Sequence, residues 1–387
     1  MDKILLICNT DGALFVFRKP IINQLISMTH AVDSISGSSQ YLPALRSLGV
    51  NAQELDFDRH SVSLLHNAHL IGKLRRMVRE SAPDIVHNFT HKPAIYGSIA
   101  ARAAGISRIY VTITGLGTLF TNDDLKSRLL RELLILQYRV ALKFVHTVFF
   151  QNPDDRDYFL RRRIVRSEQA VLTNGSGIDL EAFGVPTTTE VEQARAMLSA
   201  ELGMDLINRQ IVLFPARGVR DKGFFEYYEA AKELSKQHPA RFVFLHLGMV
   251  DAAVRGHVSR EGIEEFAKQS RVRYLGFKHN IRDYMLASDI ITLPSYREGV
   301  PRSLIEALAL GRTVVTTDAP GCRETVIDGW NGHLCQPRDV ASLAEKLEKS
   351  TPDFCISAAS RARKLCEDKF DARHLVQITL ERYKQSK

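Results

Sequence analysis

IITLPSYREGVPRSLIEA, at residues 290–307, passes from a short apolar run through a tight turn into a helical pattern. The run Ile290–Leu293 has the length and composition of a strand that is buried on both faces. Gly299 and Pro301 form the turn, and we predict that the helix begins near Arg302. A buried strand that leads directly into a helix is the repeating unit of doubly wound α/β sheets.

The same alternation runs along the chain in two blocks. In the first block the predicted strands are Ile4–Cys8, Asp84–Asn88, Ile109–Ile113 and Thr147–Gln151. In the second they are Gln210–Pro215, Phe242–Leu247, Arg271–Leu275, Ile290–Leu293 and Thr313–Thr317. Between the blocks the pattern breaks near Asn174, and a polar stretch of linker type follows at 186–190.

Two such blocks predict an α/β protein with two doubly wound Rossmann-like domains that face a central cleft. We place the domains at residues 1–185 and 186–370. A terminal helix at 371–387 is predicted to pack back on the first domain. Ligands of such sheets bind at the carboxyl ends of the strands, so the residues that follow each strand are the candidates for function.

The composition suits a globular protein, and its charge is unevenly spread. Of 387 residues, 45% are hydrophobic and 25% charged, and the net charge is +8. Residues 1–180 hold 22 basic against 16 acidic side chains, so most of the excess lies in the first half. A basic surface favours an anionic partner, although ordinary solubility explains a modest excess equally well. The apolar N-terminus has no basic region or cleavage site, and we interpret it as a first strand.

Two carboxylates mark the turn and helix at 290–307. Glu298 lies in the turn, and Glu306 lies just over one helical turn inside the helix. A carboxylate accepts two hydrogen bonds from vicinal hydroxyls, as on a sugar. The helix also begins with amides that attract an anion. Taken singly, either glutamate is equally well an exposed helix residue.

Two cations follow the strand Gln210–Pro215. Arg217 and Lys222 are spaced so that both can converge on one diphosphate, Arg as a fork and Lys as a point charge. Such cations neutralise a leaving diphosphate without a metal. The alternative is a solvated basic turn.

In the first block the candidates follow three strands. Gly12, after the first strand, lets backbone approach phosphates, although no Gly-x-Gly-x-x-Gly fingerprint is present. His91 and Lys92 follow a later strand, and a histidine there is either functional or structural. Thr114 and Gly115 open a Gly-Leu-Gly loop after the next strand.

These motifs together resemble family 4 of the GT-B glycosyltransferases over nearly the whole chain. Glu298 and Glu306 match its Glu-x7-Glu signature, Arg217 and Lys222 match its diphosphate clamp, and 174–179 resembles its hinge entry. The resemblance implies a retaining, metal-independent transferase that uses no cofactor. The loop at 114–118 is similar to that of bacterial enzymes that extend polyprenyl-diphosphate-linked sugars.

The resemblance also implies roles for individual residues. Catalysis would involve Arg217, Lys222, Glu298 and His91. The UDP-sugar donor would be bound by Gly12, Arg217, Lys222, Phe277, Glu298, Gly299, Val300, Pro301, Ser303, Leu304 and Glu306. The lipid-linked sugar acceptor would meet Lys92, Thr114 and Gly115. Where relatives carry a Glu before Gly-Leu-Gly, this chain has Thr114, which leaves the acceptor base undefined.

The implied activity is transfer of a hexose or N-acetylhexosamine from a UDP-sugar to a polyprenyl-diphosphate sugar in surface glycan biosynthesis. The alternatives are a UDP-sugar epimerase of the same fold and a transferase with a soluble acceptor. No basic motif interleaved with aromatic residues supports nucleic acid as a partner. Asp56-Phe57-Asp58 resembles a metal-binding Asp-x-Asp, but we interpret it as a surface loop.

A polyprenyl-linked acceptor would place the protein in the cytoplasm, peripherally on the inner face of the cytoplasmic membrane. Two basic amphipathic segments, 60–80 and 124–145, are candidates for docking on anionic lipid. We expect the second, more apolar segment to be an ordinary helix packed on its sheet. The first is therefore the preferred candidate, and neutralising Arg75, Arg76 and Arg79 is expected to weaken binding.

Overall fold

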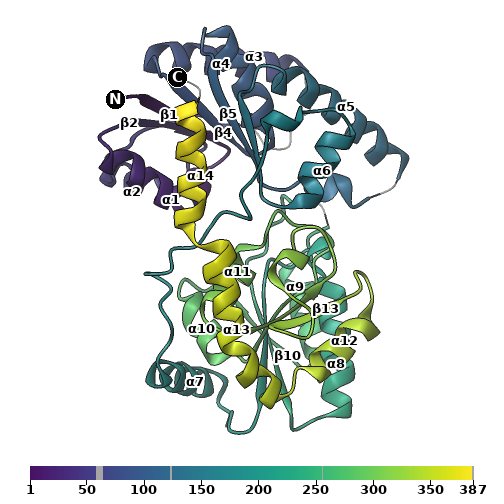
Figure 1. Ribbon diagram of the computed structural model, residues 1–387. Coiled ribbons are helices and arrows are strands. Elements are labelled where there is room, and N and C mark those ends of the chain that lie inside the picture. Colours follow the sequence, from purple (N-terminus) through teal and green to yellow (C-terminus); the bar gives the residue numbers. More distant parts are fainter. Residues whose placement is uncertain (58–63, 123, 255, 386–387) are drawn as a thin grey trace. The chain divides into compact units, whose positions relative to one another are not determined.

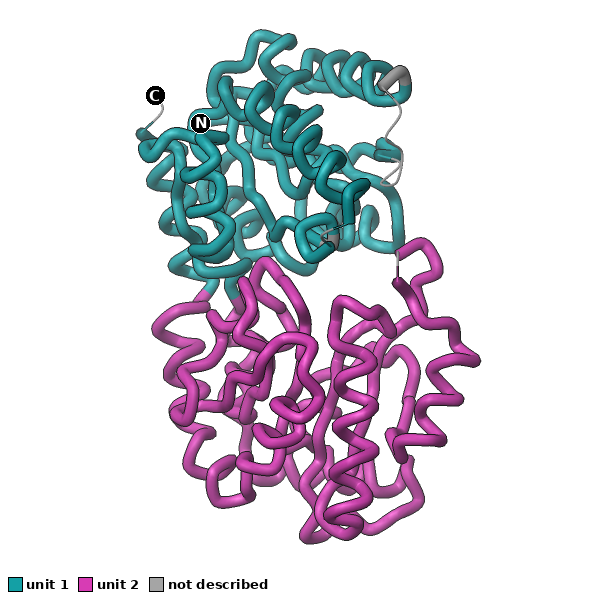
Figure 2. Tube along the Cα trace, turned by 90° about the vertical axis from the view of Figure 1, so that its right-hand side faces the viewer, with its two compact units in different colours: residues 1–177, 372–387 teal, residues 178–371 magenta. Residues whose placement is uncertain are grey.

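The computed structural model describes residues 1–57, 64–122, 124–254 and 256–385. The chain forms two compact units, distinguished by colour in Figure 2. Unit 1 comprises residues 1–177 together with 372–387, and unit 2 comprises residues 178–371. Each unit is an α/β sandwich built around its own parallel sheet (Figure 1).

The described part of unit 1 contains a seven-stranded parallel sheet of order β3-β2-β1-β4-β5-β6-β7. Its strands are β1 (Lys3–Cys8), β2 (Ala31–Ser36), β3 (Asn51–Glu54), β4 (Ile85–Phe89), β5 (Arg108–Ile113), β6 (Thr147–Phe150) and β7 (Ala170–Leu172). Its α-helices are α1 (Asp11–Ser27), α2 (Leu42–Ser47), α3 (Leu64–Ser81), α4 (Ser98–Ala103), α5 (Leu125–Leu142), α6 (Pro153–Arg161) and α14 (Ala372–Gln385).

The described part of unit 2 contains a six-stranded parallel sheet of order β10-β9-β8-β11-β12-β13. Its strands are β8 (Gln210–Pro215), β9 (Phe242–Leu247), β10 (Val272–Gly276), β11 (Ile290–Leu293), β12 (Thr313–Thr317) and β13 (Gly332–Cys335). Its α-helices are α7 (Thr188–Leu202), α8 (Phe224–Gln237), α9 (Arg260–Ser270), α10 (Ile281–Ala287), α11 (Arg302–Ala309), α12 (Val340–Lys349) and α13 (Pro352–Phe370).

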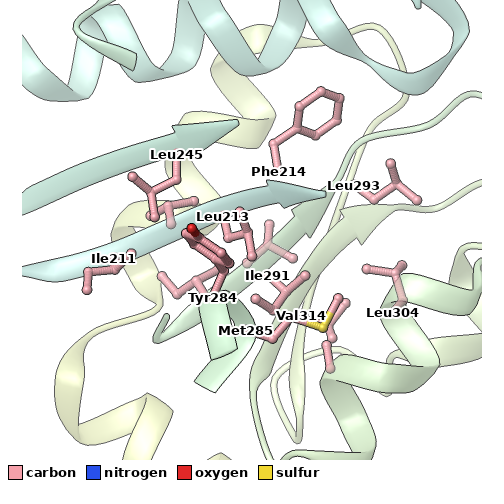
Figure 3. Packing of buried hydrophobic residues seen from close by; sticks show 14 of the residues in the cluster. Ile211, Leu213, Phe214, Leu245, Tyr284, Met285, Ile291, Leu293, Leu304 and Val314 are labelled. Carbon is pink, nitrogen blue, oxygen red and sulfur yellow. The ribbon is translucent and has the colours of Figure 1, made fainter. Parts of the chain in front are cut away.

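The apolar runs of the sequence become the cores of the two sheets. In unit 2, β11 is buried along its whole length, and Ile291 and Leu293 pack with Leu304 of α11 (Figure 3). In unit 1 successive residues of β1 alternate between two apolar clusters, one on each face of the sheet. Burial on both faces explains why these strands read as continuous apolar runs. The fold therefore confirms the predicted pair of doubly wound sheets.

The terminal helix α14 belongs to unit 1 and packs beside α1 (Figure 1). Its Tyr383 hydroxyl lies 2.7 Å from Nδ1 of the buried His87 in β4. The chain passes from one unit to the other twice, after Gly177 and before Ala372. These two residues lie very close together, because a Cβ on Gly177 (φ +70°) would lie 2.7 Å from Cα of Ala372. Only glycine accepts this approach without displacing the backbone.

Several features of the fold differ from what the sequence predicts, among them the short strands β3, β7 and β13, which were not predicted. The stretch 186–190, predicted as a linker, contains the start of α7, where Thr187 and Glu190 form a reciprocal capping box. Strand β2 was not predicted, because Asp33, Ser34 and Ser36 interrupt its apolar pattern. These polar residues are buried, and Asp33 pairs with Lys3 and accepts a hydrogen bond from Ser81.

The two candidate membrane segments differ in how much of their apolar surface is buried. In α3, Leu70, Leu74 and Val78 are buried in the core of unit 1, so its apolar face is already covered. Residues 60–63 of that segment lie outside the described residues. In α5, by contrast, leucine side chains such as Leu129 are exposed. As expected for 124–145, α5 packs on its own unit through residues such as Ile135, Tyr138 and Leu142, but a second apolar face of the helix remains exposed.

Candidate active site

In both units the candidate residues gather where the strand order reverses. In unit 2 the chain builds β8, β9 and β10 in one direction and then returns to place β11 on the other side of β8. In unit 1 the same reversal separates β1 from β4. The crevice at such a switch point is where doubly wound sheets bind ligands. Arg217 and Lys222 follow β8 and Glu298 follows β11, whereas Gly12 follows β1 and His91 follows β4.

Lys222 and Glu298 form an ion pair across the switch point of unit 2. Lys222 ends a short 3-10 turn at 220–222, and Gly223 then adopts a left-handed conformation with φ +76°. A Cβ at Gly223 would lie 2.2 Å from the carbonyl oxygen of Pro294, so glycine is needed for the turn to approach the end of β11. The turn therefore fixes the Lys222 backbone beside the Glu298 loop.

The Glu298 loop is held by neighbours on three sides. The Ser295 hydroxyl lies 2.7 Å from Oε1 of Glu298, and the Glu298 amide donates to the carbonyl of Pro320. On the β8 side, the Tyr296 amide donates to the carbonyl of Asp221. About 15% of the Glu298 side chain is exposed, so its carboxylate is mostly buried, and it forms an ion pair with Lys222.

Arg217 lies after the end of β8 and pairs with an acid that the sequence did not indicate. Its Nη1 lies 2.7 Å from Oδ2 of Asp251, and both side chains are part exposed. The backbones there approach closely, since a Cβ on Gly248 would lie 1.8 Å from the carbonyl of Ala216. Asp251 holds one end of a guanidinium that retains several donors.

Glu306 lies on α11 and is the more buried of the signature carboxylates. The Nε of Arg302, one helical turn earlier, donates to its Oε1 at 2.9 Å. Burial raises the pKa of the Glu306 carboxyl, and the charge of Arg302 opposes that rise. Arg302 therefore orients this carboxylate and favours its ionised form.

The start of α11 brings together the remaining residues of the turn. Pro301 precedes the helix and supplies no side-chain cap for its first amides, which carry the positive end of the helix dipole. Gly299 lies in the turn, Val300 is buried, and Ser303 lies in the first helical turn. Leu304 is entirely buried and its amide bonds to the Pro301 carbonyl, so its side chain serves the core.

Phe277 follows β10 at the edge of the sheet, two strands away from β8. It is about half exposed and packs edge-on against His279. Strand β9 lies between β10 and β8, so the structure places Phe277 apart from the clamp in the sheet. An exposed aromatic ring at a strand end has a face on which a base can stack.

In unit 1, Gly12 lies in the first turn of α1 beneath the ring of Tyr41. A Cβ on Gly12 would lie 3.1 Å from Tyr41. The preceding residue, Asp11, is fully buried and accepts hydrogen bonds from the amides of Ser39, Tyr41 and Leu42. Burial would raise the pKa of the Asp11 carboxyl, but these hydrogen bonds outweigh it and hold the pKa below its usual value. Asp11 thus ties the loop after β2 to the start of α1.

His91 is oriented by a tyrosine that sequence spacing could not identify. Its Nδ1 lies 2.5 Å from the hydroxyl of Tyr138 on α5, 47 residues away in the chain. Burial lowers the pKa of the His91 imidazole to about 4, so the ring is neutral at physiological pH. A Cβ on Gly117 (φ +72°) would lie 3.8 Å from its Nε2, which places the other side of the ring beside the Gly-Leu-Gly loop.

The other acceptor candidates lie around the same loop. Thr114 and Gly115 follow β5, which neighbours β4, and Gly115 has a φ of +118°. Lys92 Nζ donates to the carbonyl of Phe57 at 3.3 Å. The side chain of Thr118 lies outside the described residues. The structure therefore groups His91 with the loop, and it ties Lys92 to the chain that follows β3.

No group of three or more His, Cys, Asp or Glu side chains in the described ranges is arranged to hold a metal. Asp56 is exposed after β3, and Asp58 lies outside the described residues. Within the part of the chain that the structure describes, no helix is both long enough and apolar enough to cross a bilayer.

Comparisons with known proteins agree on one family. The family described as "Glycosyl transferases group 1" matches residues 207–353, and "Glycosyl transferase 4-like" matches residues 3–152. The N,N'-diacetylbacillosaminyl-diphospho-undecaprenol alpha-1,3-N-acetylgalactosaminyltransferase of Campylobacter jejuni is 28% identical over 345 residues, covering 89% of this chain and 88% of the relative. An Escherichia coli UDP-Gal:alpha-D-GlcNAc-diphosphoundecaprenol alpha-1,3-galactosyltransferase is 24% identical, covering 78% and 75%.

Solved structures share the fold. A glycosyltransferase from Rickettsia africae superposes with a TM-score of 0.78 at 19% identity, covering 99% of this chain and 98% of that one. Anabaena HepE, solved in complex with UDP and glucose, gives a TM-score of 0.76 at 20% identity, covering 98% and 99%. The two family matches lie in the two units and together span more than half of the chain. The chain therefore belongs to the family 4 glycosyltransferases of the GT-B fold.

Proposed function

We propose that this enzyme transfers a hexose or N-acetylhexosamine from a UDP-sugar to a polyprenyl-diphosphate-linked sugar, with retention of the anomeric configuration. The carrying observation is the Lys222–Glu298 pair at the switch point of unit 2, beside the start of α11. The names of the two relatives above, which act on diphospho-undecaprenol-linked sugars, support the acceptor class. HepE, solved with UDP and glucose, supports a UDP-sugar donor.

The proposal assigns nucleotide-sugar binding to unit 2. Arg217, Lys222 and the first amides of α11 would stabilise the negative charge that develops on the departing diphosphate. Glu306, whose ionised form is favoured by the charge of Arg302, would accept the ribose hydroxyls, and Glu298 would orient the transferred sugar. Because Lys222 already contacts Glu298, one cation links the diphosphate position to the sugar position.

Acceptor recognition is assigned to unit 1, at His91 and the loop that begins at Thr114. An imidazole with a pKa of about 4 is a weak base, so it takes a hydroxyl proton poorly. It remains a good hydrogen-bonding group for a sugar hydroxyl. We therefore propose that the departing diphosphate, and not His91, receives the acceptor proton in a front-face reaction.

A donor screen tests the reaction class. The enzyme is incubated with UDP- and GDP-sugars and a polyprenyl-diphosphate sugar, and nucleotide release and lipid product are both measured. We expect UDP release that depends on the acceptor, with an α-linked product from an α-linked donor. An epimerised UDP-sugar without a lipid product would contradict the proposal and identify an epimerase.

Metal chelation tests the cationic clamp. We expect turnover to persist in excess EDTA, because Arg217 and Lys222 supply the charge that a metal would otherwise provide. Initial rates with EDTA, Mg²⁺ and Mn²⁺ are the measurement. If EDTA abolishes turnover and Mg²⁺ or Mn²⁺ restores it, the metal-free mechanism is wrong, and Asp56 and Asp58 return as ligand candidates.

Alanine substitutions of the two signature carboxylates, Glu298 and Glu306, are expected to impair different properties of the enzyme. Glu306→Ala should weaken UDP binding by about 10- to 100-fold, since hydrogen bonds to a charged group contribute ~1.5–3 kcal/mol. Glu298→Ala should reduce transfer far more than it reduces UDP affinity. Calorimetric UDP titration and steady-state kinetics separate the two effects. Equal losses of UDP affinity in both variants would refute the division.

A further inference from the structure

Helix α5 exposes a continuous apolar stripe to solvent. Apolar side chains recur along it every three or four residues, the spacing that places them on one helical face. Between 42% and 84% of each remains exposed; they are Leu125, Leu129, Leu133, Leu136 and Val140, with Phe144 just past the end of the helix. We refer to these six residues as the α5 stripe. Isolated surface leucines are ordinary, but a row of this length marks an interaction surface.

The α5 stripe is separate from the face by which the helix packs on its own unit. The buried residues of α5 are Ser127, Ile135, Tyr138, Ala141 and Leu142. At about 100° per residue, these positions centre on the side of the helix opposite the stripe. The helix is therefore apolar on two faces, and the core of unit 1 accounts for one of them.

Cations border the α5 stripe along its length. Lys126, Arg128, Arg139 and Lys143 are all exposed on α5. On the neighbouring helix α4, the Arg102 guanidinium lies 5.8 Å from the centre of the Phe144 ring. Glu132, an acid on the exposed side of α5, pairs with Arg162, the residue that follows α6. The rim of the stripe is therefore strongly cationic.

A basic pocket adjoins the C-terminal end of the α5 stripe. It has a volume of about 610 Å³, and four cations line it: Arg139, Lys143, Arg163 and Arg166. Its one acidic lining residue, Glu168, already pairs with Arg166. A pocket of this charge, beside an apolar surface, fits an anionic headgroup whose acyl chains lie along the stripe.

We propose that α5 docks unit 1 on an anionic phospholipid bilayer, with the α5 stripe in the acyl boundary and its cationic rim among the headgroups. This is how an interfacial amphipathic helix divides its two kinds of surface. A second copy of the chain fits the same surface poorly. A symmetric antiparallel contact would bring Lys126 of one helix close to Lys143 of the other, and like charges repel.

The docking has a consequence for the acceptor site, and this part rests on the proposed function. Tyr138, on the buried face of α5, contacts His91, and Arg131 of the same helix donates to the carbonyls of Leu119 and Asn122. The inner side of α5 therefore contacts His91 and the chain that follows the Gly-Leu-Gly loop. In the proposed docking, the outer side of the same helix contacts lipid. The helix would set the depth of the acceptor site relative to the headgroup layer, where a lipid-linked diphosphate lies.

Vesicle flotation of the full chain tests the docking. Vesicles of phosphatidylcholine alone are compared with vesicles that also contain phosphatidylglycerol, at low and high salt. We expect binding to the anionic vesicles that weakens with salt. Leu129→Gln with Leu136→Gln should lower the partition coefficient by at least about 100-fold, since each buried leucine contributes about 1.5–3 kcal/mol. The matched control, Ile207→Gln with Ile356→Gln, changes exposed apolar residues of unit 2 and should leave binding unchanged.

A charge series distinguishes α5 from α3. Lys126→Gln with Lys143→Gln should weaken binding by about tenfold or more, since a cation near anionic headgroups contributes about a factor of five. Neutralising Arg75, Arg76 and Arg79 on α3 should have a smaller effect, because the buried face of α3 offers nothing to the acyl layer. Equal or greater loss from the α3 variant would overturn the assignment to α5.

Two further readouts complete the test. Flotation needs no catalysis, so it can succeed or fail independently of the proposed reaction. In the stripe variant, UDP affinity and thermal stability should match wild type, whereas transfer to an acceptor in vesicles should fall. If the stripe variant still floats, or if it turns a dimer into a monomer without changing flotation, the α5 stripe is not a membrane surface.

Discussion

Replacing Lys222 with alanine is expected to lower kcat by about 10²- to 10³-fold, since loss of one charge-stabilising donor typically costs on the order of 3 kcal/mol. Lys222 serves two positions, because it contacts Glu298 and lies beside the start of α11. In the proposed mechanism its removal takes away the cation that faces the diphosphate, and it leaves the mostly buried Glu298 carboxylate without that partner. We expect kcat to fall more than UDP affinity, because the charge develops in the transition state.

Lys278→Ala provides the matched control. Lys278 also pairs with a glutamate in unit 2, Glu201, with similar side-chain exposure, but it lies away from the switch point. The control should retain wild-type kcat. Arg217→Ala is expected to lower kcat in the same direction as Lys222→Ala. A folded Lys222→Ala enzyme with wild-type turnover would remove the assigned role.

Gly321→Ala is expected to reduce transfer by at least about tenfold, since misplacing a catalytic group by an ångström can cost 10²-fold. Gly321 has a φ of +79°, and a Cβ there would lie 2.3 Å from the carbonyl oxygens of both Glu298 and Gly299. The added methyl group must push the turn that carries Glu298. Backbone atoms cannot yield as a flexible side chain can, so the displacement reaches the site.

Gly329→Ala separates this displacement from backbone strain. Gly329 has a similar φ of +72°, yet nothing lies within 4 Å of the position of its Cβ. Both variants should lose about 1 kcal/mol of stability from the left-handed conformation. Steady-state kinetics and thermal unfolding should then show that Gly321→Ala alone loses activity. Equal activity in the two variants would show that the contact with the Glu298 turn is unimportant.

Local patterns were sufficient to predict that candidate residues of unit 2 would meet, because these residues lie at strand ends. Lys222 and Glu298 are 76 residues apart, but β8 and β11 are neighbours in the sheet. Parallel strands bring their carboxyl ends to one edge, so residues that follow neighbouring strands meet there. Sequence alone could not identify Asp251 or Gly321, since neither belongs to a spaced motif and each acts through one contact with a distant loop.

The same reasoning explains why the sequence could not distinguish the two amphipathic segments. Both 60–80 and 124–145 combine apolar and basic residues, so periodicity predicts an amphipathic helix for each. Periodicity cannot say how much of a helix its neighbours cover. The core of unit 1 takes the apolar residues of α3, whereas it takes Ile135 and Tyr138 of α5 and leaves Leu129 and Leu136 exposed.

The sequence by itself determined the two doubly wound sheets, the order of many of their elements and which candidate residues follow the strands at the switch point in unit 2. Those features depend on short-range patterns: apolar runs, turn glycines, and a helix that starts just after a strand. The tertiary structure decided which distant side chains meet, as when Tyr138 orients His91 and Arg217 pairs with Asp251. It also decided which apolar faces stay uncovered. Burial and pairing of that kind are properties of the packed chain, because they depend on residues that are close in space and remote in sequence.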